Sequence, residues 1–323
     1  MIAKADYSFI RYLAAKQSVD DRALNGHVWH SLAHSLSASN FTPPVKVLEV
    51  GAGIGTMVER VFERGLLQEA AYTAIDAEPS NVAEAQARLP RWAARQGFTV
   101  RRETPVQIQF QHAERKISVE LEAINLQEFA AREKERRAWD VLIAHAFLDL
   151  MDIPRALPML LSLLRPGGLF YSTITFDGAT VLQPEMDPQL DARIETLYHQ
   201  TMDERITAGQ PSGDSRSGRH LFGHLRDAGV ELLDAGSSDW VVFAGPGGYP
   251  ADEAYFLHFI VHTIQTALQG HPKLDAARFA DWIEGRHRQI ERSELVYIAH
   301  QLDFLGRRPV KTMAQTPCRT LAA

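Results

Sequence analysis

The stretch Val47-Leu48-Glu49-Val50-Gly51-Ala52-Gly53-Ile54-Gly55-Thr56 decides the fold of this chain. It begins as a short apolar run with little alternation, which is typical of a strand that is covered on both faces. Three glycines follow at every second position. Glycine lacks a Cβ atom, so it adopts positive φ and lets a ligand approach the backbone. The stretch therefore predicts a buried strand, a ligand-binding turn and a helix that begins near Thr56.

Outward from this turn, β-favouring runs alternate with helical patterns along the chain. The runs cover residues 71–75, 119–124, 140–144 and 169–174. The helix before the last run ends at Arg165-Pro166-Gly167-Gly168. Such alternation predicts an α/β fold with a doubly wound, Rossmann-like and mostly parallel sheet. Residues 230–233 and 240–243 are close enough in sequence to form a C-terminal antiparallel hairpin.

Several regions extend beyond this minimal plan. Residues 6–38 have a helical pattern, whereas Val106, Ile108 and Phe110 alternate with polar residues as in a β-ribbon. Residues 295–305 favour a strand, because Val-Tyr-Ile is a β-favouring run. We therefore expect an N-terminal helical cap (1–44), a core (45–245) with an inserted ribbon (about 98–120) and a lid (about 178–220), and a mainly helical C-terminal extension (246–323).

The composition is that of an ordinary globular protein, with 45% hydrophobic and 23% charged residues among 323. The net charge of −6, with Lys and Arg dispersed among acids, disfavours nucleic acid as a partner. The chain lacks an apolar run of about 18 residues and a signal-peptide pattern, so we expect no membrane span. The single cysteine, Cys318, forms no internal disulfide. We expect a cytoplasmic protein, and the ribbon and C-terminal region are candidates for a homodimer interface.

The glycine spacing distinguishes between two classes of ligand. A dinucleotide site usually has G-x-G-x-x-G, which places a helix N-terminus at a pyrophosphate. This chain instead has G-x-G-x-G, and Glu49 lies two positions before the first glycine. An acid disfavours a pyrophosphate but favours the ammonium of S-adenosylmethionine. The pattern therefore indicates S-adenosylmethionine as the cofactor.

Taken together, these residues resemble the class I S-adenosylmethionine-dependent methyltransferases. Residues 47–56 resemble motif I of that family, residues 139–148 resemble motif IV, and residues 164–169 resemble the turn before its fifth strand. The flanking segments 14–24 and 237–243 are similar to uncharacterised bacterial methyltransferases. The resemblance covers about residues 45–245, and it implies a small-molecule methyltransferase.

The resemblance also implies roles for individual residues. Asp76 matches the acid that binds both ribose hydroxyls, and Asn125 and Leu126 fall where the family binds adenine. The family more often has Asp at the place of Asn125. The implied cofactor-binding set is Glu49, Gly51, Ala52, Gly53, Gly55, Asp76, Ala77, Asn125, Leu126, His145 and Ala146.

Several residues are candidates for binding the methyl acceptor, and each of them also has a structural interpretation. His145 follows the fourth strand, where it is a candidate general base, or else its ring only packs beside the adenosine. Asp149 is a candidate partner or, as we favour, a helix N-terminal cap. Arg219 is a candidate for binding an acceptor carboxylate, or else it pairs with an acid. The candidate acceptor residues are Tyr12, Lys16, Asp149, Tyr198, His199, Arg219 and His258.

Two further patterns have a functional and a structural interpretation. Lys16 and Arg22 could close over the methionine carboxylate, or they are surface charges. His258 and His262 have an i, i+4 spacing that could bind a metal, but no third ligand lies near in sequence. We therefore expect no metal site and interpret both histidines as partly buried residues that line a helix or pocket.

The leading hypothesis is an enzyme that transfers a methyl group to an O, N or S atom of a small molecule by in-line displacement. An aminopropyltransferase on the same fold is an alternative, but paired aspartates are not evident after the fourth strand. A dehydrogenase is disfavoured by the glycine spacing and Glu49. A non-catalytic module that binds S-adenosylmethionine and regulates or scaffolds a partner also stays open.

Overall fold

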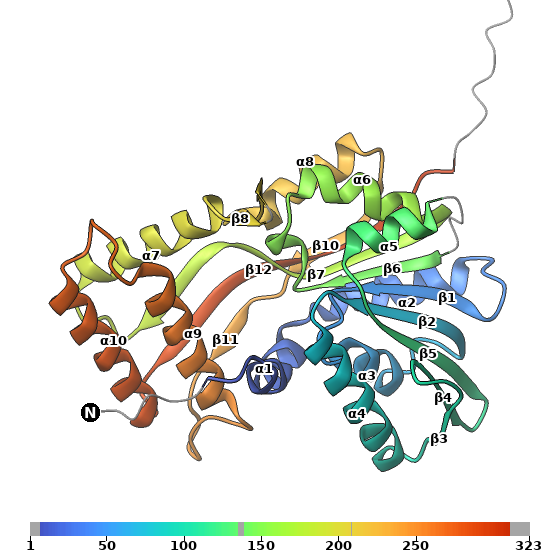
Figure 1. The fold of residues 1–323 in the computed structure, drawn as a ribbon, viewed down its shortest axis with the longest axis horizontal. Helices are drawn as coiled ribbons and strands as arrows, with labels where there is room; N and C mark the ends of the chain where they lie inside the picture. Colours follow the sequence, from blue (N-terminus) through green and yellow to red (C-terminus); the bar gives the residue numbers. More distant parts are fainter. Residues whose placement is uncertain (1–6, 135–138, 208, 311–323) are drawn as a thin grey trace, which may run out of the picture.

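The computed structural model describes residues 7–134, 139–207 and 209–310, so Cys318 lies outside the described residues. A twisted sheet runs through the molecule, with helices on both of its faces (Figure 1). No helix within these ranges is long and apolar enough to cross a bilayer. The helices are α1 (Phe9–Ala23), α2 (Gly26–Ala38), α3 (Thr56–Glu63), α4 (Pro79–Arg95), α5 (Leu126–Glu133), the 3₁₀ turn η1 (Leu148–Leu150), α6 (Ile153–Leu163), α7 (Pro188–Asp203), α8 (Ser217–Asp227), α9 (Glu253–Leu268) and α10 (Ala276–Glu291).

The strands of the main sheet are β1 (Val45–Val50), β2 (Glu69–Asp76), β3 (Thr99–Arg102), β4 (Gln107–His112), β5 (Arg115–Ala123), β6 (Trp139–His145), β7 (Leu164–Gln183), β10 (Glu231–Ser237), β11 (Trp240–Val242) and β12 (Val296–Arg307). Their order is β10-β12-β7-β6-β1-β2-β5-β4-β3, and β11 also pairs with β12. A separate two-stranded ribbon consists of β8 (Ile206–Thr207) and β9 (Gln210–Pro211).

The centre of the sheet is parallel, from β7 through β6, β1 and β2 to β5. This confirms the predicted α/β class. The chain leaves β1 in one direction toward β2 and later returns on the other side of β1 with β6. Ligands of such sheets bind at the carboxyl ends of the strands where this order reverses. The site is therefore expected beyond the ends of β1 and β6.

The antiparallel edges differ from the sequence prediction in one important respect. The predicted hairpin between residues 230–233 and 240–243 does not form, because β10 and β11 each pair with β12 instead. The true partner of β10 lies far along the chain, after α9 and α10, so spacing could not reveal it. β12 is thus an interior strand of the sheet, and the predicted division after residue 245 does not separate a helical extension from the core.

Smaller differences concern the ends of elements. The predicted helical region over residues 6–38 consists of two helices, because the side chain of Asn25 caps α2 by accepting bonds from the N–H groups of His27 and Val28. The fifth predicted strand is longer than residues 169–174, because β7 continues to Gln183 by pairing with β12. The expected ribbon is present as β3 and β4, which extend the sheet beyond β5.

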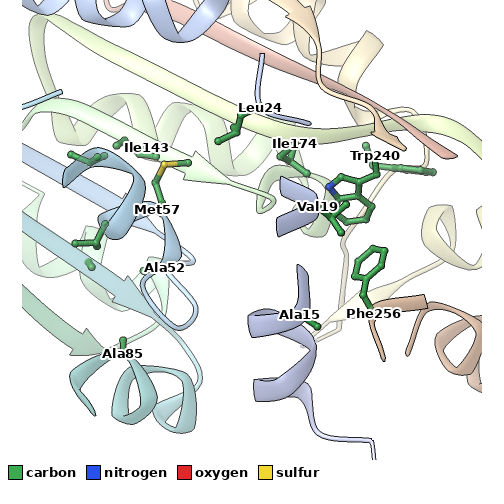
Figure 2. Close-up of a cluster of buried hydrophobic side chains, with 14 of the residues drawn as sticks. Ala15, Val19, Leu24, Ala52, Met57, Ala85, Ile143, Ile174, Trp240 and Phe256 are labelled. Atoms are coloured by element: carbon green, nitrogen blue, oxygen red, sulfur yellow. The ribbon is translucent and has the colours of Figure 1, made fainter. Parts of the chain in front are cut away.

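Apolar side chains fill both faces of the sheet. One core lies under α5, α6 and α8 and includes Phe129, Leu160 and Leu221. The larger core contains residues of α1 to α4, α9 and α10. Figure 2 shows its part beside α1, where Ala15 and Val19 lie near Trp240 and Phe256. This packing holds the N-terminal and C-terminal helices together over one end of the parallel strands.

Candidate functional site

The glycine-rich turn has the geometry that its sequence predicts. Gly51, Gly53 and Gly55 have φ values of +66°, +54° and +83°, a region that residues with a Cβ rarely adopt. A Cβ at Gly51 would lie 2.3 Å from the ring of Phe147, so the turn is also closely packed. Helix α3 begins directly afterward at Thr56. The turn therefore presents bare backbone at the carboxyl end of β1.

Asp76 ends β2 beside this turn. Its Oδ2 accepts a hydrogen bond from the N–H of Gly53 at 2.8 Å. Its Oδ1 accepts bonds from the N–H of Glu78 at 2.9 Å and from the side chain of Asn81 at 3.1 Å. These bonds fix the carboxylate next to the glycines while leaving it partly exposed. An anion in this position can accept further bonds from two vicinal hydroxyls.

The next strand end carries the predicted adenine-binding residues. Asn125 follows β5 and caps α5, because its Oδ1 accepts a hydrogen bond from the N–H of Glu128 at 2.9 Å. Leu126 is buried, and Ala77 is exposed beyond the end of β2. The carboxyl ends of β1, β2 and β5 thus bring the cofactor candidates of three segments to one edge of the sheet.

Glu49 lies deeper than the sequence suggests. Its side chain is 1% exposed, and its Oε2 accepts a hydrogen bond from the hydroxyl of Tyr72 at 2.7 Å. Burial raises the pKa of Glu49 to about 8, although the bond from Tyr72 opposes this shift. The carboxyl is therefore mainly neutral at neutral pH, and a nearby ammonium would favour its ionised form.

We expect Glu49→Gln to stabilise the protein more at high pH than at low pH. The pKa of Glu49 rises from 4.5 to about 8 on folding, so the folded state keeps a proton that the unfolded state loses. Stability therefore falls as the pH rises through this window, and the glutamine removes that loss. Melting temperatures at about pH 5 and about pH 9 measure the effect. The exposed Glu78→Gln serves as the control, and a gain for Glu49→Gln that is equal at both pH values contradicts the prediction.

A cavity of about 340 Å³ extends from the glycine-rich turn. On the turn side it is lined by Gly51, Ala52, Gly53, Thr56, His145 and Ala146. On the other side, α1, α7, α9, β7 and β12 contribute mainly apolar residues, and several of them are aromatic: Tyr12, Phe176, Tyr198, Phe259 and Tyr297. The N-terminal helix, the lid segment and the C-terminal segment thus meet at one cavity.

A buried network of charges joins α1 to the floor of this cavity. Asp20 is 1% exposed, and its carboxylate contacts the ammonium of Lys16 at 2.8 Å and the indole N–H of Trp240 at 2.9 Å. It also contacts Nε2 of His145 at 3.0 Å and the guanidinium of Arg60 at 3.6 Å. Burial alone would raise the pKa of Asp20, but the charges of Lys16 and Arg60 and the hydrogen bond with His145 outweigh burial and hold that pKa well below its usual range. The network fixes α1 against α3 and β6.

His145 is part of this network through both ring nitrogens. Nε2 lies near Asp20, and Nδ1 lies 2.8 Å from the hydroxyl of Thr173. Burial lowers the pKa of His145 to about 4, despite the opposing attraction of Asp20. The ring is therefore neutral at pH 7 and occupied by protein partners, which favours its interpretation as a packing residue over that of a general base.

The structure brings four of the candidate acceptor residues together. Tyr12, Lys16, Asp149 and Tyr198 line the cavity. Asp149 lies inside the turn η1 and is not the helix cap that we favoured, because Asp152 precedes α6. One carboxylate oxygen of Asp149 is buried without a hydrogen-bond partner among the described residues.

The other three candidates lie outside the cavity, and each has a protein partner. Arg219 donates from Nε to Asp177 at 2.9 Å, so its alternative interpretation as an ion pair holds. The ring of His199 contacts the hydroxyl of Thr180 at 2.9 Å. His258 stacks on His287 and contacts its Nδ1 at 2.7 Å. These three side chains lie on helix faces that point away from the cavity, and the sequence alone does not show which face of a helix points inward.

The two histidines of α9 and the two basic residues of α1 contact separate partners. His262 stacks on Tyr7 and so faces a different partner from His258. Within the described ranges, no group of three potential ligands could hold a metal ion. Arg22 pairs with the buried Glu253 at 2.5 Å, whereas Lys16 reaches the cavity.

Sequence reasoning missed several residues of the site. Asp20, Arg60 and Trp240 form or support the network, and Arg205 and Gln301 line the cavity. Asp20 lies four residues after Lys16 on one helix face, a spacing that could have indicated the pair. The others come from distant segments, and only the fold brings them together.

Comparisons with known proteins agree with this geometry. Residues 48–170 match the family model described as a methyltransferase domain. This range runs from β1 through the turn, the acid of β2 and the strand β6 into β7. No curated protein matches the whole sequence significantly.

Solved structures show distant similarity. The YcgJ protein of Bacillus subtilis is 12% identical, with a TM-score of 0.45, and the alignment covers 87% of this chain and 99% of that one. Geranyl diphosphate C-methyltransferase of Streptomyces coelicolor is 9% identical, with a TM-score of 0.38, and 85% and 76% are covered. Phosphoethanolamine N-methyltransferase 2 of Haemonchus contortus is 11% identical, with a TM-score of 0.43, and 95% and 59% are covered.

These structural similarities are too distant to bear on the substrate. The family match and the geometry are more direct, since the matched range contains the turn, Asp76 and β6 in the order that the sequence predicts. Residues 48–170 thus form a methyltransferase domain, and this part of the chain has the fold of the class I S-adenosylmethionine-dependent methyltransferases.

Proposed function

We propose that the protein transfers the methyl group of S-adenosylmethionine to an O, N or S atom of a small molecule by in-line displacement. The observation that carries this proposal is one continuous cavity of about 340 Å³ that reaches from the glycine-rich turn to walls with several aromatic residues. Its volume is within the range of small-molecule sites. A sealed acceptor side would instead favour a module that only binds the cofactor.

The residues at the edge of the sheet fit the cofactor. The glycines leave room for a ligand against the backbone, and Asp76 offers carboxylate oxygens beside them for the ribose. Asn125 and Leu126 would contact the adenine, and Glu49 would face the methionyl ammonium. When bound, S-adenosylmethionine supplies an electrophilic methyl group on its sulfonium.

The protein's own residues would contribute to the reaction mainly by positioning the acceptor and the cofactor. Helix α1 is held over the cavity by the network around Asp20, while Tyr12 and Phe259 stack with ring centroids 4.2 Å apart. These side chains would exclude water and hold the acceptor in line with the methyl group. Because both nitrogens of His145 have protein partners, no step requires it as a base.

We expect the protein to bind S-adenosylhomocysteine with a dissociation constant in the micromolar range and not to bind NAD. The glycine spacing, Glu49 and Asp76 suit the first ligand and not a pyrophosphate. Isothermal titration calorimetry with both ligands tests this directly. Tighter binding of NAD than of S-adenosylhomocysteine would contradict the assignment of this site to S-adenosylmethionine.

Two sequence predictions concern the location of the protein and its oligomeric state. A cytoplasmic location and a homodimer built from the β3–β4 ribbon or the C-terminal helices are both predictions. Sedimentation of the purified protein would measure the oligomeric state.

A further inference from the structure

The charged side chains that line the cavity fall into two groups. Lys16 is paired with Asp20, and Asp214 is paired with the ring of His220 at 2.6 Å. Arg205 and Asp149 are different. In the part of the chain that the structure describes, no acid forms an ion pair with the guanidinium of Arg205, and Oδ1 of Asp149 is buried without a hydrogen-bond partner.

Among the described residues, Arg205 is partly buried and yet lacks the acid partner that the buried Arg60 and the partly buried Arg88 have. Arg60 pairs with Asp21 at 2.5 Å, Arg88 with Glu59 at 2.8 Å, and even the half-exposed Arg219 pairs with Asp177. A guanidinium keeps its charge at all physiological pH values, and partial burial without a counter-charge costs free energy. Arg205 is therefore placed to gain from an anion that enters the cavity.

Arg205 and Asp149 lie around one turn. A Cβ at Gly213 would be 3.3 Å from the carbonyl oxygen of Asp149 and 3.4 Å from Cζ of Arg205. The N–H of Gly213 donates to the carbonyl of Met151, which fixes the turn beside η1. The guanidinium and the 3₁₀ turn that carries Asp149 thus flank the same backbone position at the cavity wall.

The remaining walls suit an apolar body with few polar groups. The acceptor side of the cavity is lined mainly by apolar side chains, which include aromatic rings from α1, α7, α9 and β12. Gln301 is 1% exposed, and its Oε1 has no hydrogen-bond partner among the described residues. Burial raises the pKa of Asp149, while the positive charges of Arg205 and Lys16 oppose this shift.

We propose that the acceptor is a small carboxylate with a largely apolar, aromatic-sized body, and that Arg205 binds its carboxylate. This proposal rests on the proposed methyltransferase function and specifies its substrate class. Arg205 can hold a carboxylate through two parallel hydrogen bonds, which gives orientation as well as affinity. The apolar body would then lie among the aromatic rings between Arg205 and the glycine-rich turn.

The test uses pairs of probes that differ only in charge. The protein is saturated with S-adenosylhomocysteine and titrated with 4-hydroxyphenylacetate and its amide, and with indole-3-acetate and its amide. We expect at least one acid to bind about tenfold more tightly than its amide, equivalent to ~1.4 kcal/mol. Arg205→Met should abolish this preference, and Arg205→Lys, which keeps the charge but not the fork, should retain part of it.

Arg219→Met is the matched control, since Arg219 lies outside the cavity and should leave the preference unchanged. Equal binding of acid and amide, no binding of either at millimolar concentration, or an unchanged preference in Arg205→Met overturns the proposal. The same titration distinguishes a failure of the proposed methyltransferase function from a failure of the proposed substrate class. If S-adenosylhomocysteine itself does not bind, the proposed function fails, whereas normal cofactor binding without acid preference removes only the substrate class.

Discussion

Asp20→Ala should lower the free energy of unfolding by about 3–5 kcal/mol, the usual cost of breaking a buried ion pair from one side. The substitution removes the acid that contacts Lys16, His145 and Trp240 in a site that is 1% exposed. Lys16 would be left buried with its charge uncompensated. Urea unfolding monitored by tryptophan fluorescence measures the loss.

The neighbouring Asp21 provides a close control for this prediction. It also pairs with Arg60, but its side chain is 39% exposed. Asp21→Ala should therefore cost clearly less than Asp20→Ala, because Asp21 is partly exposed and the buried Arg60 keeps Asp20 as an acidic neighbour at 3.6 Å. Similar losses for the two variants would show that the buried network around Asp20 does not stabilise the docking of α1.

Asp76→Ala should weaken the binding of S-adenosylhomocysteine by about 1–3 kcal/mol, the scale of a hydrogen bond to a charged group. The protein should stay folded, because Asp76 lies at a strand end and is partly exposed. Calorimetry gives the dissociation constant, and circular dichroism checks the fold. Glu78→Ala removes a nearby exposed charge and should leave the affinity unchanged. An unaltered affinity in folded Asp76→Ala rules out its role at the ribose.

The parallel half of the fold could be predicted from the sequence because its signals are local. The apolar run before Gly51 and the strand that ends at Asp76 each lie within a few residues of the turn that they form. The antiparallel partner of β10 could not be found in this way. It follows an insertion that contains α9 and α10, and strand pairing over such a distance leaves no trace in local spacing.

The candidate site likewise has one side that local sequence signals predict and one side that they do not. The cofactor side consists of motifs in which spacing fixes geometry, so the position of Asp76 beside the glycine-rich turn could be predicted from the sequence. The acceptor side depends on which face of a helix points inward. Tyr198 and His199 are adjacent on α7, yet only Tyr198 lines the cavity. Similarly, no local pattern indicates that Arg205 lacks an acid, because the absent partner would come from another segment.

The interior position of β12 has a consequence for synthesis on the ribosome. β12 lies between β7 and β10, yet it is made after both of them and after the helical insertion. Until residues 296–307 emerge, a nascent chain carries an unpaired edge on β7 that runs to Gln183. Exposed strand edges are templates for pairing with other chains. A chain that stalls within α10 therefore already has the strands whose ends carry the glycine-rich turn and Asp76. The same chain still exposes the unpaired edge of β7, which makes it prone to aggregate.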